Sequence, residues 1–380
     1  MKITVVCDVL GEENNGTTIA AMNLIRYLIS RDHEVRILCA DQDKQGMPGC
    51  YVVPNRSFGL LDGYLAENGV TLAKPEVDIV RRAIDGADIV HVMLPFALGL
   101  CAAKEARSAG IPISAGCHLL AENFSTHIFM KKSRLVNHLA YLHFSRLYKH
   151  CDAIHYVTQY LRDLYEGMFG VTNGYVISNG VNEMFCPEEE KRTDDKINIL
   201  YTGRYSKEKS HMTLIRAVGY SAYRDRIRLI FAGDGPQKKK LHRAVKKLPV
   251  PPIFRFFTRE EMVHVNRSAD LYVHAAEYEA EGIGCLEALA TGVVPVICNS
   301  KKSATRFYAI DEKSLFTPGR PKELAAKIDW WIDHPEEKAE YSEKYAEMAR
   351  EKFDHIACMQ AMERMMEKTV REAKERQKDA

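Results

Sequence analysis

The pattern of apolar and polar positions in the first half of the chain predicts strands that alternate with helices. Short runs rich in Val, Ile and Ala are separated by longer amphipathic segments that show helical periodicity. Strands that alternate with helices are typical of a doubly wound parallel sheet, which classifies the fold as α/β. The strands expected here cover residues 2–9, 34–40, 87–94, 111–117, 153–158 and 174–178.

The second half repeats this alternation after a polar segment. Residues 186–196 contain one Pro and almost no apolar residue, which makes them the best candidate for a domain linker. Strands are expected at 197–203, 227–233 and 270–275, and helices at 211–222 and 285–291. Residues 356–378 lack Gly and Pro and predict one long terminal helix. We therefore expect domains at 1–186 and 187–355, followed by a helix at 356–380.

A glycine-rich turn lies between the strand at 270–275 and the helix at 285–291. It carries Glu279, Gly282, Ile283 and Gly284, and Glu287 follows about one turn into the helix. Glycine lets backbone approach a ligand closely, and free amides at a helix start suit a diphosphate or a sugar hydroxyl. A capped helix with solvated charges is the alternative interpretation of this segment.

Cationic side chains follow the strand at 197–203. Gly203 ends that strand, Arg204 follows it, and Lys209 comes five residues after Arg204. Because a parallel sheet binds ligands at the carboxyl ends of its strands, these cations favour a phosphorylated ligand. Ordinary surface charges would give the same local pattern.

Four segments together resemble the family 4 retaining glycosyltransferases. They are Asn15-Gly16-Thr17-Thr18, Asn179-Gly180-Val181-Asn182, Gly203-Arg204 with Lys209, and the stretch from Glu279 to Glu287. The resemblance covers nearly all of the chain. It implies the GT-B fold, in which two Rossmann-like doubly wound domains face each other across a cleft and a C-terminal helix crosses back to the first domain.

The resemblance also implies a role for individual residues. The catalytic set is His118 beside the donor sugar, Arg204 and Lys209 on the diphosphate, and Glu279 on a hydroxyl of the transferred sugar. Cations at the phosphates oppose the charge that develops on the leaving group. Donor contacts comprise Gly16, Arg204, Lys209, Glu279, Gly282, Ile283, Gly284 and, on the ribose, Glu287; acceptor contacts comprise Glu122 and Asn123.

Several of these roles have alternatives. His118 follows a strand, where a histidine is often a hydrogen-bonded structural residue. Glu281 departs from the family pattern and could reach the donor sugar, reach the acceptor or face water. No catalytic base is assigned, since same-face displacement lets the leaving phosphate take the acceptor proton.

Composition narrows the partners. A formal net charge of +2 on 380 residues gives no reason to expect nucleic acid binding. The ten cysteines are scattered, which favours a reducing compartment. The first strand begins at Lys2 and no apolar run approaches the ~20 residues of a spanning helix, so we expect a cytoplasmic protein without a signal peptide. No pattern requires a metal or another cofactor beyond the UDP-sugar substrate.

The acceptor prediction depends on residues 128–150, which contain five Lys or Arg and no acid. Such a helix can lie in a membrane interface, with Lys131, Lys132 and Arg134 near anionic lipid. Packing on the sheet is the alternative for this helix. A second basic cluster at 238–247 could add attraction or be a solvated helix.

The run from His118 to Asn123, followed by this basic helix, resembles glycosyltransferases that act on diacylglycerol and related lipids. We therefore expect a hexosyltransferase, peripheral at the inner face of the membrane, that moves glucose or galactose from a UDP-sugar to a lipid hydroxyl. Alternatives are a transferase of cell-surface polysaccharide or other glycan assembly and, from another class, a nucleotide-sugar epimerase or binding protein. An epimerase could draw its acid and base from Glu279, Glu281 and His118.

Overall fold

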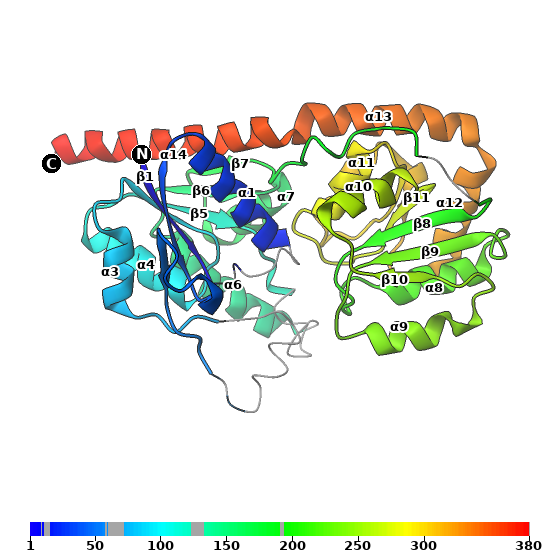
Figure 1. Cartoon of the computed structure of the whole chain (residues 1–380), viewed down its shortest axis with the longest axis horizontal. Helices are drawn as coiled ribbons and strands as arrows, with labels where there is room; N and C mark the ends of the chain where they lie inside the picture. The colour runs from blue at the N-terminus through cyan, green and yellow to red at the C-terminus, as the bar shows by residue number, and fades with distance from the viewer. Residues whose placement is uncertain are drawn as a thin grey trace. The chain divides into compact units, whose positions relative to one another are not determined.

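The computed structural model describes residues 1–8, 10, 16–57, 59, 72–122, 133–190 and 194–379, without the side chain of Arg134. The chain divides into two compact units, shown in Figure 1. The first unit comprises residues 1–179 together with 358–380, and the second comprises residues 180–357. Each unit contains one parallel sheet with its own apolar core.

The first unit contains a seven-stranded sheet in the order β3-β2-β1-β4-β5-β6-β7, and every neighbouring pair is parallel. Its order reverses direction between β1 and β4, as in a doubly wound sheet. The strands are β1 (Lys2–Cys7), β2 (Glu34–Cys39), β3 (Cys50–Val52), β4 (Ile89–Val92), β5 (Ile113–Cys117), β6 (Ala153–Tyr156) and β7 (Gly174–Val176). The helices are α1 (Gly16–Ser30), α3 (Val77–Ile84), α4 (Ala97–Ser108), α6 (Arg134–Tyr148) and α7 (Gln159–Phe169).

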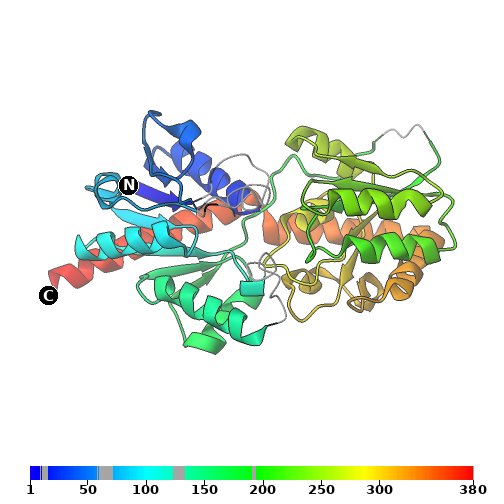
Figure 2. The same cartoon turned by 90° about the horizontal axis from the view of Figure 1, so that it is seen from below.

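The last helix, α14 (His355–Lys378), packs on the first unit, as expected from the resemblance. It runs beside that unit in both views of the molecule (Figures 1 and 2). Its methionines, among them Met362 and Met366, join the core formed by β1 and α1. Glu363 on the same helix accepts hydrogen bonds from the Tyr27 hydroxyl and the His33 ring, each over 2.8 Å. Apolar burial and this polar contact therefore hold α14 in place.

The second unit contains a six-stranded parallel sheet in the order β10-β9-β8-β11-β12-β13. Its strands are β8 (Ile197–Thr202), β9 (Ile227–Ala232), β10 (Ile253–Arg255), β11 (Leu271–His274), β12 (Pro295–Cys298) and β13 (Leu315–Phe316). Its helices are α8 (His211–Tyr220), α9 (Lys238–Ala244), α10 (Arg259–Arg267), α11 (Ile283–Ala290), α12 (Pro321–Asp333) and α13 (Pro335–Phe353). The central strands β8 and β11 are almost completely buried, as a sheet covered on both faces requires.

The predicted elements are present with shifted ends. The helix after the glycine turn begins at Ile283 rather than at residue 285, and α8 ends at Tyr220 rather than at 222. The sequence pattern did not predict the short edge strands β3, β10 and β13. Of the basic segment 128–150, only the part from residue 133 lies among the described residues. No helix in the described part of the chain is long and apolar enough to cross a membrane.

Candidate active site

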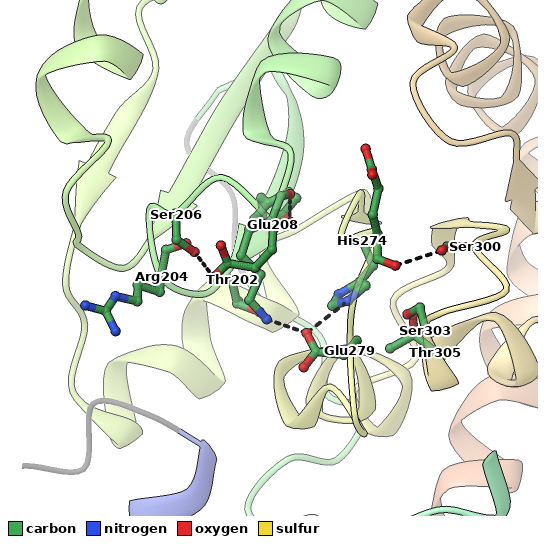
Figure 3. A network of polar contacts seen from close by, with 12 residues as sticks. Thr202, Arg204, Ser206, Glu208, His274, Glu279, Ser300, Ser303 and Thr305 are labelled. Carbon is green, nitrogen blue, oxygen red and sulfur yellow. Dashed lines mark hydrogen bonds and ion pairs between the residues drawn. The ribbon is translucent and has the colours of Figure 1, made fainter. Parts of the chain in front are cut away.

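Two loops of the second unit meet because β8 and β11 are neighbours in a parallel sheet, so their carboxyl ends lie at one edge. The loop after β8 carries Lys209, and the loop after β11 carries Glu279. The Lys209 ammonium donates a hydrogen bond to Glu279 Oε2, and both side chains are largely buried, with 19% and 12% of their surface exposed. Figure 3 shows Glu279 within a network of polar contacts. The structure therefore brings together two of the predicted catalytic residues.

A buried histidine completes the network around Glu279. His274, the last residue of β11, places Nε2 3.4 Å from Glu279 Oε2 (Figure 3). Its Nδ1 lies 3.2 Å from the Tyr272 hydroxyl, which in turn lies 2.9 Å from Thr202 Oγ1. No role for His274 follows from the sequence, because a strand residue in an apolar run predicts only core packing. Its position at the strand end, five residues before Glu279, was the available signal.

Electrostatics keep Glu279 ionised. Burial by itself raises the pKa of the Glu279 carboxyl, but Lys209 and His274 outweigh burial and lower the pKa to about 2. Burial lowers the pKa of His274 more than Glu279 raises it. At neutral pH, Glu279 is therefore an ionised carboxylate and His274 is a largely neutral imidazole. A carboxylate of this kind is suited to accept a hydrogen bond from a sugar hydroxyl.

The two glycines of the turn are required by packing. Gly282 has a φ of +88° and caps α11, and a Cβ there would lie 2.5 Å from Thr305 Cγ2. A Cβ on Gly284 would lie 2.1 Å from Thr202 Oγ1. Both glycines therefore let the start of α11, where Ile283 is the first residue, lie close against β8 and the segment at 303–305.

Glu287 lies one turn into α11, as predicted, but its partner was not predicted. The residue is 4% exposed, and its Oε1 accepts a hydrogen bond from Arg259, the first residue of α10. Burial raises the pKa of the Glu287 carboxyl, and Arg259 opposes that effect. Arg259 lies 28 positions from Glu287 in the chain, so local sequence patterns could not pair them.

Arg204 lies apart from the Glu279 network. Its side chain is half-buried and in Figure 3 extends away from Glu279. It packs beside Gly235 in the loop after β9, where the Tyr205 amide donates to the Asp234 carbonyl over 2.8 Å. The structure thus places Arg204 where the loops after β8 and β9 adjoin.

Glu281 is only 4% exposed. The interpretation of Glu281 as a carboxylate that merely faces water is therefore wrong, because the residue is almost completely buried.

In the first unit, His118 is buried at the end of β5. Its ring lies over Gly116, where a Cβ would come 2.3 Å from His118 Nε2, and it meets the His155 ring edge-on at 5.5 Å between centroids. Together with His91, these histidines line a cavity of about 10 Å³, which is enough for about one water molecule. Burial lowers the pKa of all three imidazoles, so His118 is neutral at pH 7.

The remaining predicted residues of the first unit are placed as follows. Glu122 is buried and accepts a hydrogen bond of 2.7 Å from the Tyr141 hydroxyl on α6. Gly16 is exposed and begins α1. Asn123, Lys131, Lys132 and the side chain of Arg134 lie outside the described residues.

The outer face of α6 carries three exposed leucines. Leu135, Leu139 and Leu142 are 68%, 54% and 40% exposed, and spacings of four and three residues place them on one side of a helix. Arg146 and Lys149, near the C-terminal end of α6, are also exposed, and residues 133–149 contain no Asp or Glu. The other side is buried through Tyr141, Phe144, Leu147 and Tyr148. Thus α6 packs on its own unit and still presents apolar and cationic side chains outward.

Comparison with known proteins matches a glycosyltransferase family model to each half of the chain. Residues 14–184 match Glycosyltransferase Family 4, and residues 185–351 match the glycosyl transferases group 1 family. HepE from Anabaena, solved in complex with UDP, superposes with a TM-score of 0.76 over 97% of this chain and all of that chain, at 17% identity. That likeness establishes the fold.

Two curated relatives match smaller parts of the chain. The alpha-monoglucosyldiacylglycerol synthase of Streptococcus pneumoniae is 26% identical over 230 residues, which is 56% of this chain and 52% of that protein. This chain therefore spans about half the length of that relative. The GDP-mannose-dependent alpha-mannosyltransferase of Corynebacterium glutamicum is 25% identical over 319 residues, 77% of this chain and 71% of that protein. Two sheets of Rossmann type and two family matches that together run from residue 14 to 351 lead to one conclusion: the chain belongs to the family 4 glycosyltransferases and has the GT-B fold.

Proposed function

We propose that this glycosyltransferase moves a hexose, glucose or galactose, from a UDP-sugar to a membrane lipid hydroxyl such as that of diacylglycerol, with retention at the anomeric carbon. The observation that carries the lipid acceptor is the exposed leucine face of α6, flanked by cations. The named activity of the streptococcal relative agrees with a lipid acceptor.

The donor half of the proposal follows from the second unit. Lys209 and Arg204 would neutralise the diphosphate, because cations gain most where negative charge grows on the leaving group. Glu279, kept ionised by Lys209, would accept a hydrogen bond from a hydroxyl of the transferred sugar. Glu287 would accept from the ribose, and the turn at Gly282, Ile283 and Gly284 would bring backbone close to the donor.

Retention fits a same-face displacement. The bond between the anomeric carbon and the phosphate oxygen breaks, the bond to the acceptor oxygen forms on the same face, and the acceptor proton moves to the leaving phosphate. His118, neutral because it is buried, would hold a sugar hydroxyl rather than carry charge. Glu122 and Asn123 would contact the acceptor, and Gly16 would let the first loop approach the donor.

The acceptor half follows from an interfacial helix. Leucines on one face can enter the boundary between head groups and acyl chains, and cations beside them are attracted to anionic lipid. Arg146 and Lys149 supply such cations near the C-terminal end of α6, and Lys131, Lys132 and Arg134, the basic residues that come earlier in the sequence, would add to this attraction. This arrangement would bring the enzyme to the surface that contains its acceptor.

The epimerase alternative needs an acid and a base that exchange a proton near neutral pH. Glu279 has a pKa of about 2 and is held by Lys209, so it is a poor proton donor. A transferase that acts on a soluble or polyprenyl-linked glycan remains the alternative within the family.

The test is incubation of the purified protein with radiolabelled UDP- and GDP-sugars and vesicles that contain diacylglycerol, followed by mass analysis of the organic extract. We expect label from a UDP-hexose in a lipid product of one added hexose. A lipid product labelled from GDP-mannose would show that the UDP-hexose donor is wrong. Label found only in free sugar would reject the lipid acceptor. Consumption of no donor would reject the transferase chemistry.

Variants of α6 test the membrane contact separately. Replacing Leu135, Leu139 and Leu142 with Ser should weaken binding to anionic vesicles while hydrolysis of the donor continues. Val171→Ser is the matched control, since Val171 is an apolar residue that is 89% exposed elsewhere in the same unit. Equal vesicle binding by the triple variant and the control would contradict the interfacial role of α6.

A further inference from the structure

We infer that Arg259 is a positioning residue for the donor nucleotide: it holds one oxygen of the Glu287 carboxylate so that the other oxygen can accept a hydrogen bond from the ribose. This inference rests on the proposed function, because it takes Glu287 as the ribose ligand. It adds a residue to the site that neither the sequence motifs nor the family comparison indicated.

The position of Arg259 is fixed by its own helix. Thr258 caps α10 in a capping box, in which its hydroxyl accepts from the Glu261 amide over 3.2 Å and Glu261 accepts from the Thr258 amide over 2.9 Å. A reciprocal cap of this kind fixes the first turn of a helix. Arg259 is the first residue of that turn, so the capping box fixes the position of its backbone.

The guanidinium is held by two contacts. Its carbon lies 4.9 Å from the centroid of the Phe185 ring, which is buried, and Nη1 donates to Glu287 Oε1. A planar guanidinium that stacks on an aromatic face while it donates has little rotational freedom. The Arg259 side chain is 29% exposed and that of Glu287 is 6% exposed. The Arg259–Glu287 pair is therefore held in place by Phe185 and is mostly shielded from solvent.

The Glu287 carboxylate is left with one oxygen for a ligand. Oε1 is taken by Arg259, and within the described part of the chain the structure shows no hydrogen-bond partner for Oε2. A carboxylate in such a buried setting needs compensation for lost hydration. Arg259 supplies a charge, and a ribose hydroxyl can supply the missing hydrogen bond.

The electrostatic role of Arg259 gives the inference a distinctive readout. Burial raises the pKa of Glu287, and Arg259 is the charged neighbour that lowers it. Without Arg259 the carboxyl would protonate at a higher pH, and a protonated oxygen accepts more weakly. Loss of Arg259 should thus make nucleotide binding weaken as the pH falls, whereas loss of packing alone would not depend on pH.

The experiment measures the affinity of UDP and of 2′-deoxy- and 3′-deoxy-UDP by calorimetry at pH 6 and pH 8. For the wild type we expect at least one deoxy analogue to bind about tenfold or more weakly, the scale of a hydrogen bond to a charged group. Arg259→Gln should lose most of that preference and bind UDP more weakly at pH 6 than at pH 8. The double variant Arg259→Gln/Glu287→Gln has no carboxyl at position 287. Any pH dependence of its UDP affinity therefore comes from titration of the nucleotide itself and serves as the baseline.

Two further variants separate positioning from folding. Arg259→Lys keeps a cation and should restore part of the ribose preference. Lys344→Gln removes an exposed pair between Lys344 and Glu340 on α13 of the same unit and should leave the preference unchanged. In the transfer assay, Arg259→Gln should raise KM for the donor and leave kcat nearly unchanged, because a ribose contact is the same before and during the reaction.

The outcomes distinguish this inference from the proposed function. If the wild type binds UDP with a ribose preference and Arg259→Gln keeps that preference at both pH values, the positioning role is wrong while the donor site stands. If Arg259→Gln and Arg259→Lys lose affinity equally and without dependence on pH, Arg259 serves only packing. If the wild type binds no nucleoside diphosphate, the proposed donor falls and the positioning role falls with it.

Discussion

Replacing Lys209 with Met would remove the charge that compensates buried Glu279 and keep a linear side chain of similar length. In the wild type the pKa of Glu279 lies at about 2 instead of 4.5, despite burial that by itself raises it. At about 1.4 kcal/mol for each pKa unit, the folded second unit gains roughly 3 kcal/mol at neutral pH from this shift. Lys209 is the largest cause that lowers the pKa, and His274 adds to it, so Lys209→Met should lose a large part of that amount, on the scale of the ~3–5 kcal/mol typical of a broken buried pair.

Urea unfolding followed by tryptophan fluorescence is a selective assay for this effect. Trp330 and Trp331 are the only tryptophans of the chain, and both belong to α12 in the second unit. The signal therefore reports the unit that contains Glu279. Lys238→Met is the control, because the ion pair between Lys238 and Asp234 is about half exposed and should contribute at most ~1 kcal/mol.

The stability that Glu279 contributes should depend on pH in opposite directions in the wild type and in Lys209→Met. The wild-type contribution of Glu279 is present above pH 4.5 and is lost as the pH falls toward 2. In Lys209→Met, burial raises the pKa of Glu279, so the variant regains stability as the pH falls from 7 toward 4. The difference between the two proteins should therefore shrink on acidification, and adding Glu279→Gln should restore most of the loss. A loss equal to that of Lys238→Met, or one independent of pH, would refute the reasoning.

Arg204→Ala should lower kcat by about 100-fold or more if Arg204 offsets diphosphate charge in the transition state; steady-state transfer rates near wild type would remove it from the mechanism. Asp8, buried after β1, has a pKa raised by burial to about 7, so its contribution to stability is present below pH 3.8 and is lost as the pH rises to about 7. Asp8→Asn should remove that slope, and an unchanged melting profile between pH 4 and 7 would contradict the assignment.

The sequence predicted the elements whose signals are local. Apolar runs identified the buried central strands, and Gly282 with Gly284 identified the turn that packs against Thr202 and Thr305. The edge strand β10 was not predicted because only three residues pair and their side chains are partly exposed, so no apolar run marks it. Periodicity detects burial, and an edge strand has little of it.

The unpredicted parts of the site depend on contacts between distant segments. Arg259 pairs with Glu287 only because α10 and α11 bring them together, and His274 acts on Glu279 only because the loop after β11 folds back. On α6, the cations are the feature visible in the sequence, whereas exposure in the structure singles out Leu135 and Leu139. A charge pattern is visible in sequence, but the exposed side of an amphipathic helix depends on what covers the other side.

The pairing of Lys209 with Glu279 has a consequence for donor selection under the proposed function. In the structure each side chain satisfies the other, so a ligand that takes Lys209 for its phosphate leaves the Glu279 carboxylate without its strongest partner. A free nucleoside diphosphate supplies the phosphate alone, whereas a sugar donor supplies the phosphate and a hydroxyl for Glu279 together. Because an uncompensated buried carboxylate is costly, the intact donor should be favoured over the product nucleotide by this exchange. The ion pair would thus favour binding of the donor and, once the sugar has moved to the acceptor, release of the nucleotide.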